Sequence, residues 1–155
     1  MEHSRKWKPA GITPTAETEL RVESGAGPTL LAHYSRLITR KNDRGELIAP
    51  EEAIDKVTLM KMATVWPSYY VLKEKEIGTL EAGKLADFVV FNKDYFTTPD
   101  DELGTVFPLM TVVGGKTVVL REELANEWGV PAIGPQIKFR FKPDPFDFMN
   151  DKGGD

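Results

Sequence analysis

Several residue types and patterns are scarce in this 155-residue sequence, and each absence excludes a class of protein or site. There is no cysteine, so neither a disulfide framework nor a thiolate metal site can form. No run of about 18 apolar residues occurs, so we predict no membrane-spanning helix and no membrane partner. The amino-terminal residues lack the apolar core of a secretory signal peptide, and we therefore expect a cytoplasmic protein.

Basic charge is also in short supply. The chain has 20 lysines and arginines and 24 aspartates and glutamates, which gives a net charge of −4. Proteins that bind nucleic acids or anionic membranes need a basic surface. Residues 138–142 alternate basic and aromatic side chains, and aromatic rings such as Phe139 and Phe141 can stack on bases. Because Asp144 and Asp147 follow, we favour a tail that docks its phenylalanines on the domain. We predict no nucleic-acid partner.

Histidine is limited to His3 and His33, far apart in the sequence. A hydrolytic metal site takes at least three protein ligands, commonly histidine and carboxylate. No such set can be assembled from these two residues. The acids Glu17, Glu19 and Glu23, and those at 100–102, lie in polar segments and are interpreted as solvated charge. The sequence predicts no metal site and no catalytic residue in this chain.

Apolar residues at helical spacing predict three helices in the first half. The first runs from about Pro28 to Arg40. A second opens at Pro50, where two glutamates favour a helix start. The third runs from Pro67 to Leu72, since proline starts helices well.

The second half has the pattern of strands and turns. Gly83 suits a type II turn, and residues 87–91, with their unbroken apolar run after Asp87, predict a strand covered on both faces. Thr98 before a proline and acids predicts a hydroxyl-capped helix start. Gly114–Gly115 between β-branched runs predicts a hairpin, whose first strand begins at Pro108 and hence at an edge or outside the ladder. A short helix at 121–128 should end at Gly129.

The expected fold class is therefore α+β, helical first and β-rich later. We divide the chain into an irregular arm (1–27), a helical segment (28–75), strands with a hairpin (76–120), and a short helix with an extended tail (121–155).

Three stretches carry a family resemblance, namely residues 62–71, 77–91 and 109–118, which read MATVWPSYYV, IGTLEAGKLADFVVF and LMTVVGGKTV. Their order and spacing resemble the carboxy-terminal end of the amidohydrolase superfamily, most closely its amidohydrolase-3 branch. Ala82 stands where the family usually has proline, and Trp66 where it has asparagine. Lys84 and Asp87 match well-kept family positions, to which we assign a structural role.

The resemblance implies a particular origin for each half of the chain. The helices would be the last ones of a (β/α)8 barrel, and the strands would be the carboxy-terminal strands of a small composite β-sandwich. Enzymes of this superfamily hydrolyse amide-like small molecules with one or two divalent metals such as zinc. Most of their ligands would lie in a part of the parent enzyme that this chain does not contain. The family's last-strand aspartate should fall just before the first helix, but no aspartate occurs before Lys41. Either that ligand lies upstream of Met1 or this branch has lost it.

By the family order, the first helix follows the last barrel strand, whose loop borders the active site. His33, Arg36 and Arg40 are therefore the candidate substrate-lining residues, against the alternative of an ordinary helix surface. The chain alone should be inactive and should self-associate through its exposed barrel-facing surface. The alternative function is a non-catalytic, β-rich domain used in assembly or binding.

Overall fold

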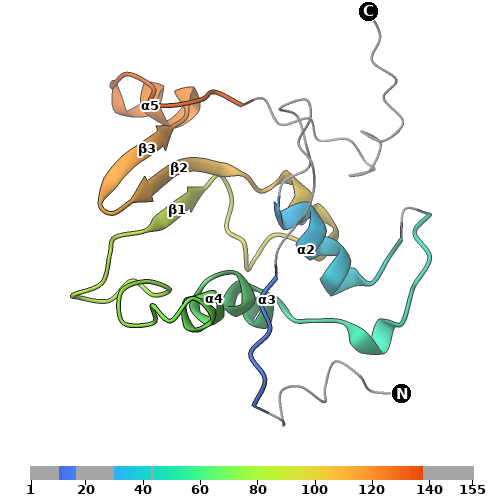
Figure 1. The fold of residues 1–155 in the computed structure, drawn as a ribbon. Helices are drawn as coiled ribbons and strands as arrows, with labels where there is room; N and C mark the ends of the chain where they lie inside the picture. Colours follow the sequence, from blue (N-terminus) through green and yellow to red (C-terminus); the bar gives the residue numbers. More distant parts are fainter. Residues whose placement is uncertain (1–10, 17–29, 43, 138–155) are drawn as a thin grey trace, which may run out of the picture.

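The computed structural model describes residues 11–16, 30–42 and 44–137, and the fold is α+β (Figure 1). Short helices precede and surround a small antiparallel sheet. In chain order the elements are α2 (Leu30–Thr39), the 3-10 turn η1 (Pro50–Glu52), α3 (Lys56–Ala63), α4 (Val65–Tyr70), β1 (Phe88–Phe91), the 3-10 helix η2 (Asp100–Thr105), β2 (Pro108–Val113), β3 (Lys116–Leu120) and α5 (Glu122–Trp128).

Helix α2 confirms the first predicted helix over residues 30–39; residues 28 and 29 lie outside the described part. Its apolar stripe buries Leu31 and Tyr34. The helix ends where Arg40 takes a positive φ of 55° and donates its N–H to the Arg36 carbonyl at 2.9 Å.

The prediction of a second helix opening at Pro50 is wrong. Only a single 3-10 turn forms there, and Ala53 is extended. The helix starts later because Asp55 caps it, accepting from the Thr58 backbone N–H at 2.8 Å. The break also lets the Ile54 N–H reach the Leu37 carbonyl on α2 at 3.1 Å, a tertiary bond that a continuous helix would not allow.

Helix α4 begins two residues before the predicted Pro67. Proline is tolerated there, since N–H groups of a first turn have no intrahelical acceptor. The end of the helix is closed by the Lys73 N–H, which donates to the Ser68 carbonyl at 2.8 Å. This closure places Leu72 in the left-handed region, with φ of 56°, where glycine is usual.

The sheet is an antiparallel meander in the order β1-β2-β3. The predicted hairpin joins β2 to β3, and Gly114 and Gly115 take the positive φ values of 56° and 77° that its turn requires. Pro108 is the first residue of β2, a position proline tolerates. The strand it opens is the central one, so the expectation of an edge strand is wrong.

The prediction that the strand at 87–91 is covered on both faces is also wrong. Val89 is 44% exposed, while its neighbours Phe88 and Val90 are half-buried. In the described part of the chain, α5 packs on the sheet through Leu124 and Ala125, which form a small core with Leu120 of β3. Val89 is the most exposed residue of β1.

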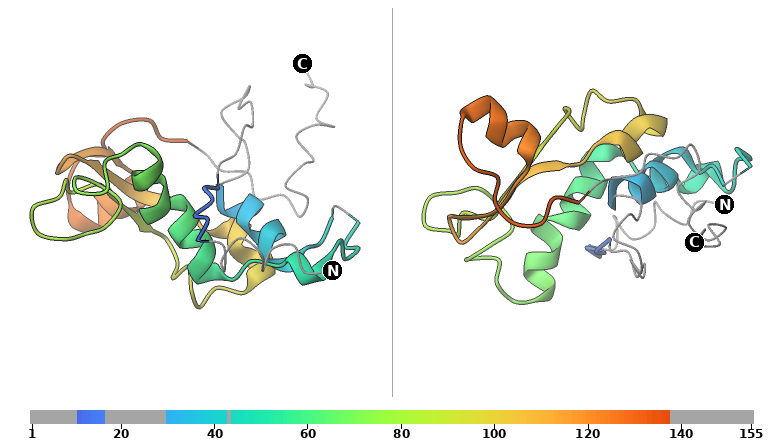
Figure 2. Two further views of the ribbon diagram at one scale, coloured as in Figure 1. Left: turned by 60° about the horizontal axis from the view of Figure 1, so that its bottom comes forward. Right: turned by 90° about the horizontal axis from the view of Figure 1, so that it is seen from above.

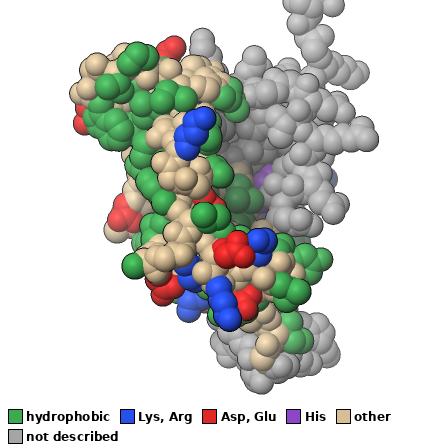
Figure 3. Space-filling model, turned by 60° about the vertical axis from the view of Figure 1, so that its left-hand side comes forward, with side chains coloured by type: hydrophobic (Ala, Val, Ile, Leu, Met, Phe, Trp, Pro, Cys, Tyr) green, Lys and Arg blue, Asp and Glu red, His purple; other side chains and the backbone are tan. Residues whose placement is uncertain are grey.

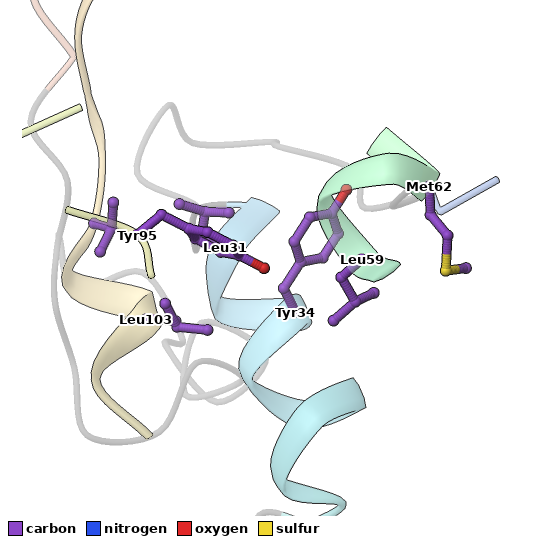
Figure 4. Packing of buried hydrophobic residues seen from close by; sticks show 7 residues of the cluster. Leu31, Tyr34, Leu59, Met62, Tyr95 and Leu103 are labelled. Atoms are coloured by element: carbon purple, nitrogen blue, oxygen red, sulfur yellow. The ribbon is translucent and has the colours of Figure 1, made fainter. Parts of the chain in front are cut away.

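A larger core lies between the helices (Figure 4). It joins α2 to α3 and to the segment that ends in η2, and Figure 2 shows α2 lying alongside η2. Its buried members are Leu31, Tyr34, Leu59, Met62, Tyr95, Leu103 and Val106.

Of two further predictions, the helix cap at Thr98 is wrong and the last helix is confirmed. Thr98 does not cap η2, because its Oγ1 donates to the Asp94 carbonyl at 2.6 Å. Helix α5 confirms the last predicted helix and ends at Gly129 with φ of 65°. None of the described helices is long and apolar enough to cross a membrane.

Candidate functional site

The predicted site residues lie on or just after α2. Leu31 and Tyr34 point into the core, whereas His33 and Arg36 are half-buried. Burial, and then the neighbouring Arg36 guanidinium, lower the pKa of His33 below its ordinary value of 6.5. His33 is therefore a neutral imidazole near pH 7, next to a fixed positive charge.

Arg40 is held elsewhere. Its side-chain Nε donates to the Ile48 carbonyl at 3.0 Å, and its own carbonyl accepts from the Ile48 N–H at 2.8 Å. These bonds close the loop between Arg40 and Ile48. The structure thus brings His33 and Arg36 together and holds Arg40 against a loop; contact of any of the three with substrate stays a prediction.

The described residues do not fit a metal centre. No three histidine, aspartate or glutamate side chains among them come close enough to hold a metal ion. His33 is a poor ligand besides, because Arg36 repels a second cation beside it. The acids at 100–102 are exposed, as predicted, and Asp100 pairs with Lys56 at 3.0 Å. Residues 17–23 lie outside the described part.

Lys84 and Asp87 have the structural contacts predicted for them. Lys84 Nζ donates to the Glu74 carbonyl at 2.7 Å and pairs with Glu81 at 3.2 Å. The predicted turn lies between Glu81 and Lys84, where the Lys84 N–H donates to the Glu81 carbonyl at 3.1 Å and Gly83 has a φ of 91°. Asp87 Oδ1 accepts from the Gly114 N–H at 2.6 Å and so ties the start of β1 to the hairpin.

The sequence did not predict a group of polar contacts around Lys56 at the amino end of α3, which we call the Lys56 clip. Lys56 Nζ is largely buried and donates to the carbonyls of Phe96 and Thr98 as well as pairing with Asp100. The Tyr95 hydroxyl donates back to the Lys56 carbonyl at 3.2 Å. Its partners lie about forty positions away, so no local pattern could have revealed it.

Two tyrosines are buried: Tyr34, which belongs to the apolar stripe of α2, and Tyr95, which no local pattern indicated. Burial raises the pKa of Tyr34 and of Tyr95 to about 12. The Tyr34 hydroxyl is buried between α2 and α3 without a hydrogen-bond partner in the described structure (Figure 4). The clip and these tyrosines join polar contacts to the apolar core, and among the described residues they do not form a nucleophile with a base beside it.

Comparison with known proteins matches the sequence pattern of the amidohydrolase family, in its amidohydrolase-3 form, to residues 24–119. The chain belongs to the amidohydrolase family. A curated relative, the 5-methylthioadenosine/S-adenosylhomocysteine deaminase of Thermodesulfovibrio yellowstonii, is 42% identical over 55 residues. That stretch is 36% of this chain and 12% of the deaminase, so the chain matches a small part of its relative. No solved structure matches significantly.

The family match confirms the resemblance read from the three sequence stretches. Its range runs from before α2 to the end of β3, so it includes the helical core, the Lys84 turn and the hairpin. Amidohydrolases typically depend on a metal, and the described residues of this member provide no set of ligands for one.

Proposed function

We propose that this chain is the carboxy-terminal part of a metal-dependent hydrolase that acts on carbon–nitrogen bonds of small amide-like molecules. The observation that supports this is the amidohydrolase family match over residues 24–119. In this proposal α2 to α4 are the last helices of a (β/α)8 barrel, and β1 to β3 are strands of a composite β-sandwich. A divalent metal such as zinc would be held by residues of the parent enzyme outside this chain.

The relative's name supports the type of bond. It is named a deaminase, and deamination by hydrolysis breaks a carbon–nitrogen bond in a small molecule. Within this chain, His33 and Arg36 are the residues proposed to border the substrate. A neutral imidazole can donate or accept one hydrogen bond, and the guanidinium can pair with an anionic group. Arg40 is proposed to contribute indirectly, by holding in place the loop between Arg40 and Ile48.

The first test is the metal content of the purified chain after incubation with zinc and dialysis. We expect well under one zinc per chain and no hydrolysis of amide or aminopurine substrates, because the proposal places the ligands elsewhere. Stoichiometric zinc, or zinc-dependent turnover by this chain alone, would contradict it.

The second test is the genomic sequence upstream of Met1. We expect an in-frame barrel with a His-x-His pair, since the proposal assigns the ligands to a longer parent. A stop codon followed by a promoter would instead favour the second candidate function, a non-catalytic domain used in assembly or binding.

That second candidate has its own supporting observation, which is the exposure of large apolar side chains on α4 and the loop after it. Tyr70, Leu72 and Leu80 are 82%, 86% and 71% exposed. Figure 3 shows apolar side chains open on this side of the molecule, interspersed with charges. Large exposed apolar groups often mark interaction sites. In either function we expect such surfaces to promote self-association of the isolated chain, measurable by sedimentation.

A further inference from the structure

The segment after α5, residues 130–137, lies against the outer edge of β3, and we call it the strap. Leu120 of β3 exchanges two backbone hydrogen bonds with Ile133 of the strap, both at 2.9 Å. β3 is otherwise an edge strand of the sheet, and an uncovered edge is a template for pairing with another chain. The earlier part of the strand carries the charged Lys116 and the bulged Val118, which both discourage such pairing. The strap covers the end of the strand that these two leave unprotected.

Gly134 lets the strap approach β3 closely. Its φ is 72°, and a Cβ added there would overlap the carbonyl oxygen of Val118. That oxygen belongs to the backbone of the strand, so it cannot move aside as the end of a flexible side chain could. Glycine is therefore required here for two reasons, the conformation of the backbone and the lack of space.

The Gln136 side chain fastens the strap to both β3 and α5. Its Oε1 accepts from the Glu122 N–H at 3.0 Å, and a first-turn N–H of this kind has no acceptor within its own helix. Its Nε2 donates to the Leu120 carbonyl on β3 and to the Gly134 carbonyl within the strap, both at 3.2 Å. One amide group thus joins strand, helix and strap.

Arg121 marks the boundary between what the strap holds and what the sheet holds. Its backbone N–H donates to the Leu109 carbonyl at 2.9 Å, away from the strap, because successive residues of a strand alternate in direction. This bond does not depend on the strap. The Arg121 guanidinium, in contrast, donates to the Ile137 carbonyl at the end of the strap.

We propose that the strap is a conformational device that guards the β3 edge and opens as one unit with the first turn of α5. Its apolar residues Val130, Ile133 and Ile137 are 44%, 40% and 42% exposed, so polar contacts and the close fit at Gly134 hold it more than burial does. Segments with few buried apolar contacts open at the lowest free energy. The open form presents the backbone groups of Leu120 to other chains. The proposal is independent of the catalytic role of the parent enzyme.

Hydrogen exchange of individual amides, followed by NMR on the full chain, tests whether the strap opens as a unit. Three amides bond across it, namely those of Leu120, Glu122 and Ile133. In Gly134→Ala all three should lose protection together, because the added methyl group has no room beside β3. The Arg121 amide and the amides of α3 should keep their protection, since their acceptors lie outside the strap.

Gly129→Ala is the matched control. Gly129 has a similar φ of 65°, and an added Cβ there would meet nothing within 4 Å. The two variants share the backbone strain, so the difference between them isolates the contact with β3. We expect protection of the three amides to fall about tenfold further in Gly134→Ala than in the control. Gln136→Leu, which removes the fastening amide and leaves Gly134 in place, should also open all three amides and keeps the test valid if Gly134→Ala does not fold.

The guarding role has a separate readout. Thioflavin T fluorescence reports cross-β pairing, and it should rise earlier for Gly134→Ala and Gln136→Leu than for Gly129→Ala at equal concentration. Association through exposed apolar side chains alone would not give this signal. Three amides that respond independently, an Arg121 amide that opens with them, equal protection in Gly134→Ala and its control, or open variants that form cross-β structure no sooner would each overturn the proposal.

Discussion

Replacing Gly78 by alanine should be among the most destabilising single-methyl changes in this protein. Gly78 lies in the loop after α4 at φ of 96°, where an L-residue is strained. An added Cβ would lie 2.7 Å from Ser68 Oγ, 2.9 Å from Ser68 Cβ and 3.3 Å from Val65 Cα. Ser68 cannot easily move aside, because it is 1% exposed and its hydroxyl donates to the Val65 carbonyl at 2.7 Å.

The magnitude follows from three effects. The positive φ costs alanine about 1–2 kcal/mol. Forcing a methyl group into a filled site costs about 1–3 kcal/mol. The more restricted unfolded chain of the alanine variant returns about 0.4–1 kcal/mol. We therefore expect Gly78→Ala to lower the free energy of unfolding by about 3 kcal/mol.

Urea unfolding followed by circular dichroism, at fixed protein concentration, measures this loss. Gly83→Ala is the matched control, because Gly83 has nearly the same φ of 91° and an added Cβ there would meet nothing within 4 Å. The control should lose about 1 kcal/mol, from backbone strain alone. Equal losses for the two variants would refute the idea that the loop is packed against Ser68, whatever their common size.

Three further changes probe other features. Leu72→Gly should raise the free energy of unfolding by about 0.5–1 kcal/mol, because glycine suits the left-handed end of α4. Stability should fall between about pH 10 and 12, since Tyr34 and Tyr95 keep their protons to about 12 in the folded chain and lose them near 10 when unfolded; ultraviolet absorbance of tyrosinate follows both. His33 has a lowered pKa, so its contribution is present above pH 6.5 and is lost as the pH falls below that value; His33→Gln should flatten this part of the urea-midpoint profile.

Each of these three predictions has an outcome that would contradict it. Leu72→Ala keeps a side chain at the strained position, so a gain equal to that of Leu72→Gly would point away from backbone strain. Tyrosinate forming in the folded chain near pH 10 at all positions would contradict the burial of Tyr34 and Tyr95. An acid profile unchanged by His33→Gln would assign the pH dependence to other groups.

Features encoded within a few residues could be predicted from the sequence. A positive φ is needed in the Gly114–Gly115 hairpin, in the Gly83 turn and at the end of α5 at Gly129. A glycine at these places in the sequence indicates that φ locally. The family could be recognised as well, because a helical stretch, a turn with its strand and a hairpin follow one another in a fixed order.

The predictions that were wrong concern features that depend on contacts between distant segments. The helix predicted from Pro50 is broken because Ile54 bonds to α2. The burial predicted for both faces of β1 is incomplete, since Val89 is 44% exposed. For the candidate site, contact of His33, Arg36 and Arg40 with a substrate stays a prediction from the family order. The Lys56 clip could not be predicted from the sequence, because the partners of Lys56 lie in a segment about forty residues later.

The segment after α5 sets a practical boundary for anyone who shortens this protein. Gln136 Oε1 accepts from the Glu122 N–H at 3.0 Å, so the amino end of α5 is capped from fourteen residues downstream, and its side-chain amide donates to the Leu120 carbonyl at 3.2 Å. Arg121 holds the Ile137 carbonyl as well. A chain cut after Gly129 would keep the described helices and strands, yet it would lose the Gln136 cap of α5 and the Ile133 segment that pairs with β3. A shortened chain that keeps these contacts therefore has to retain the residues up to Ile137.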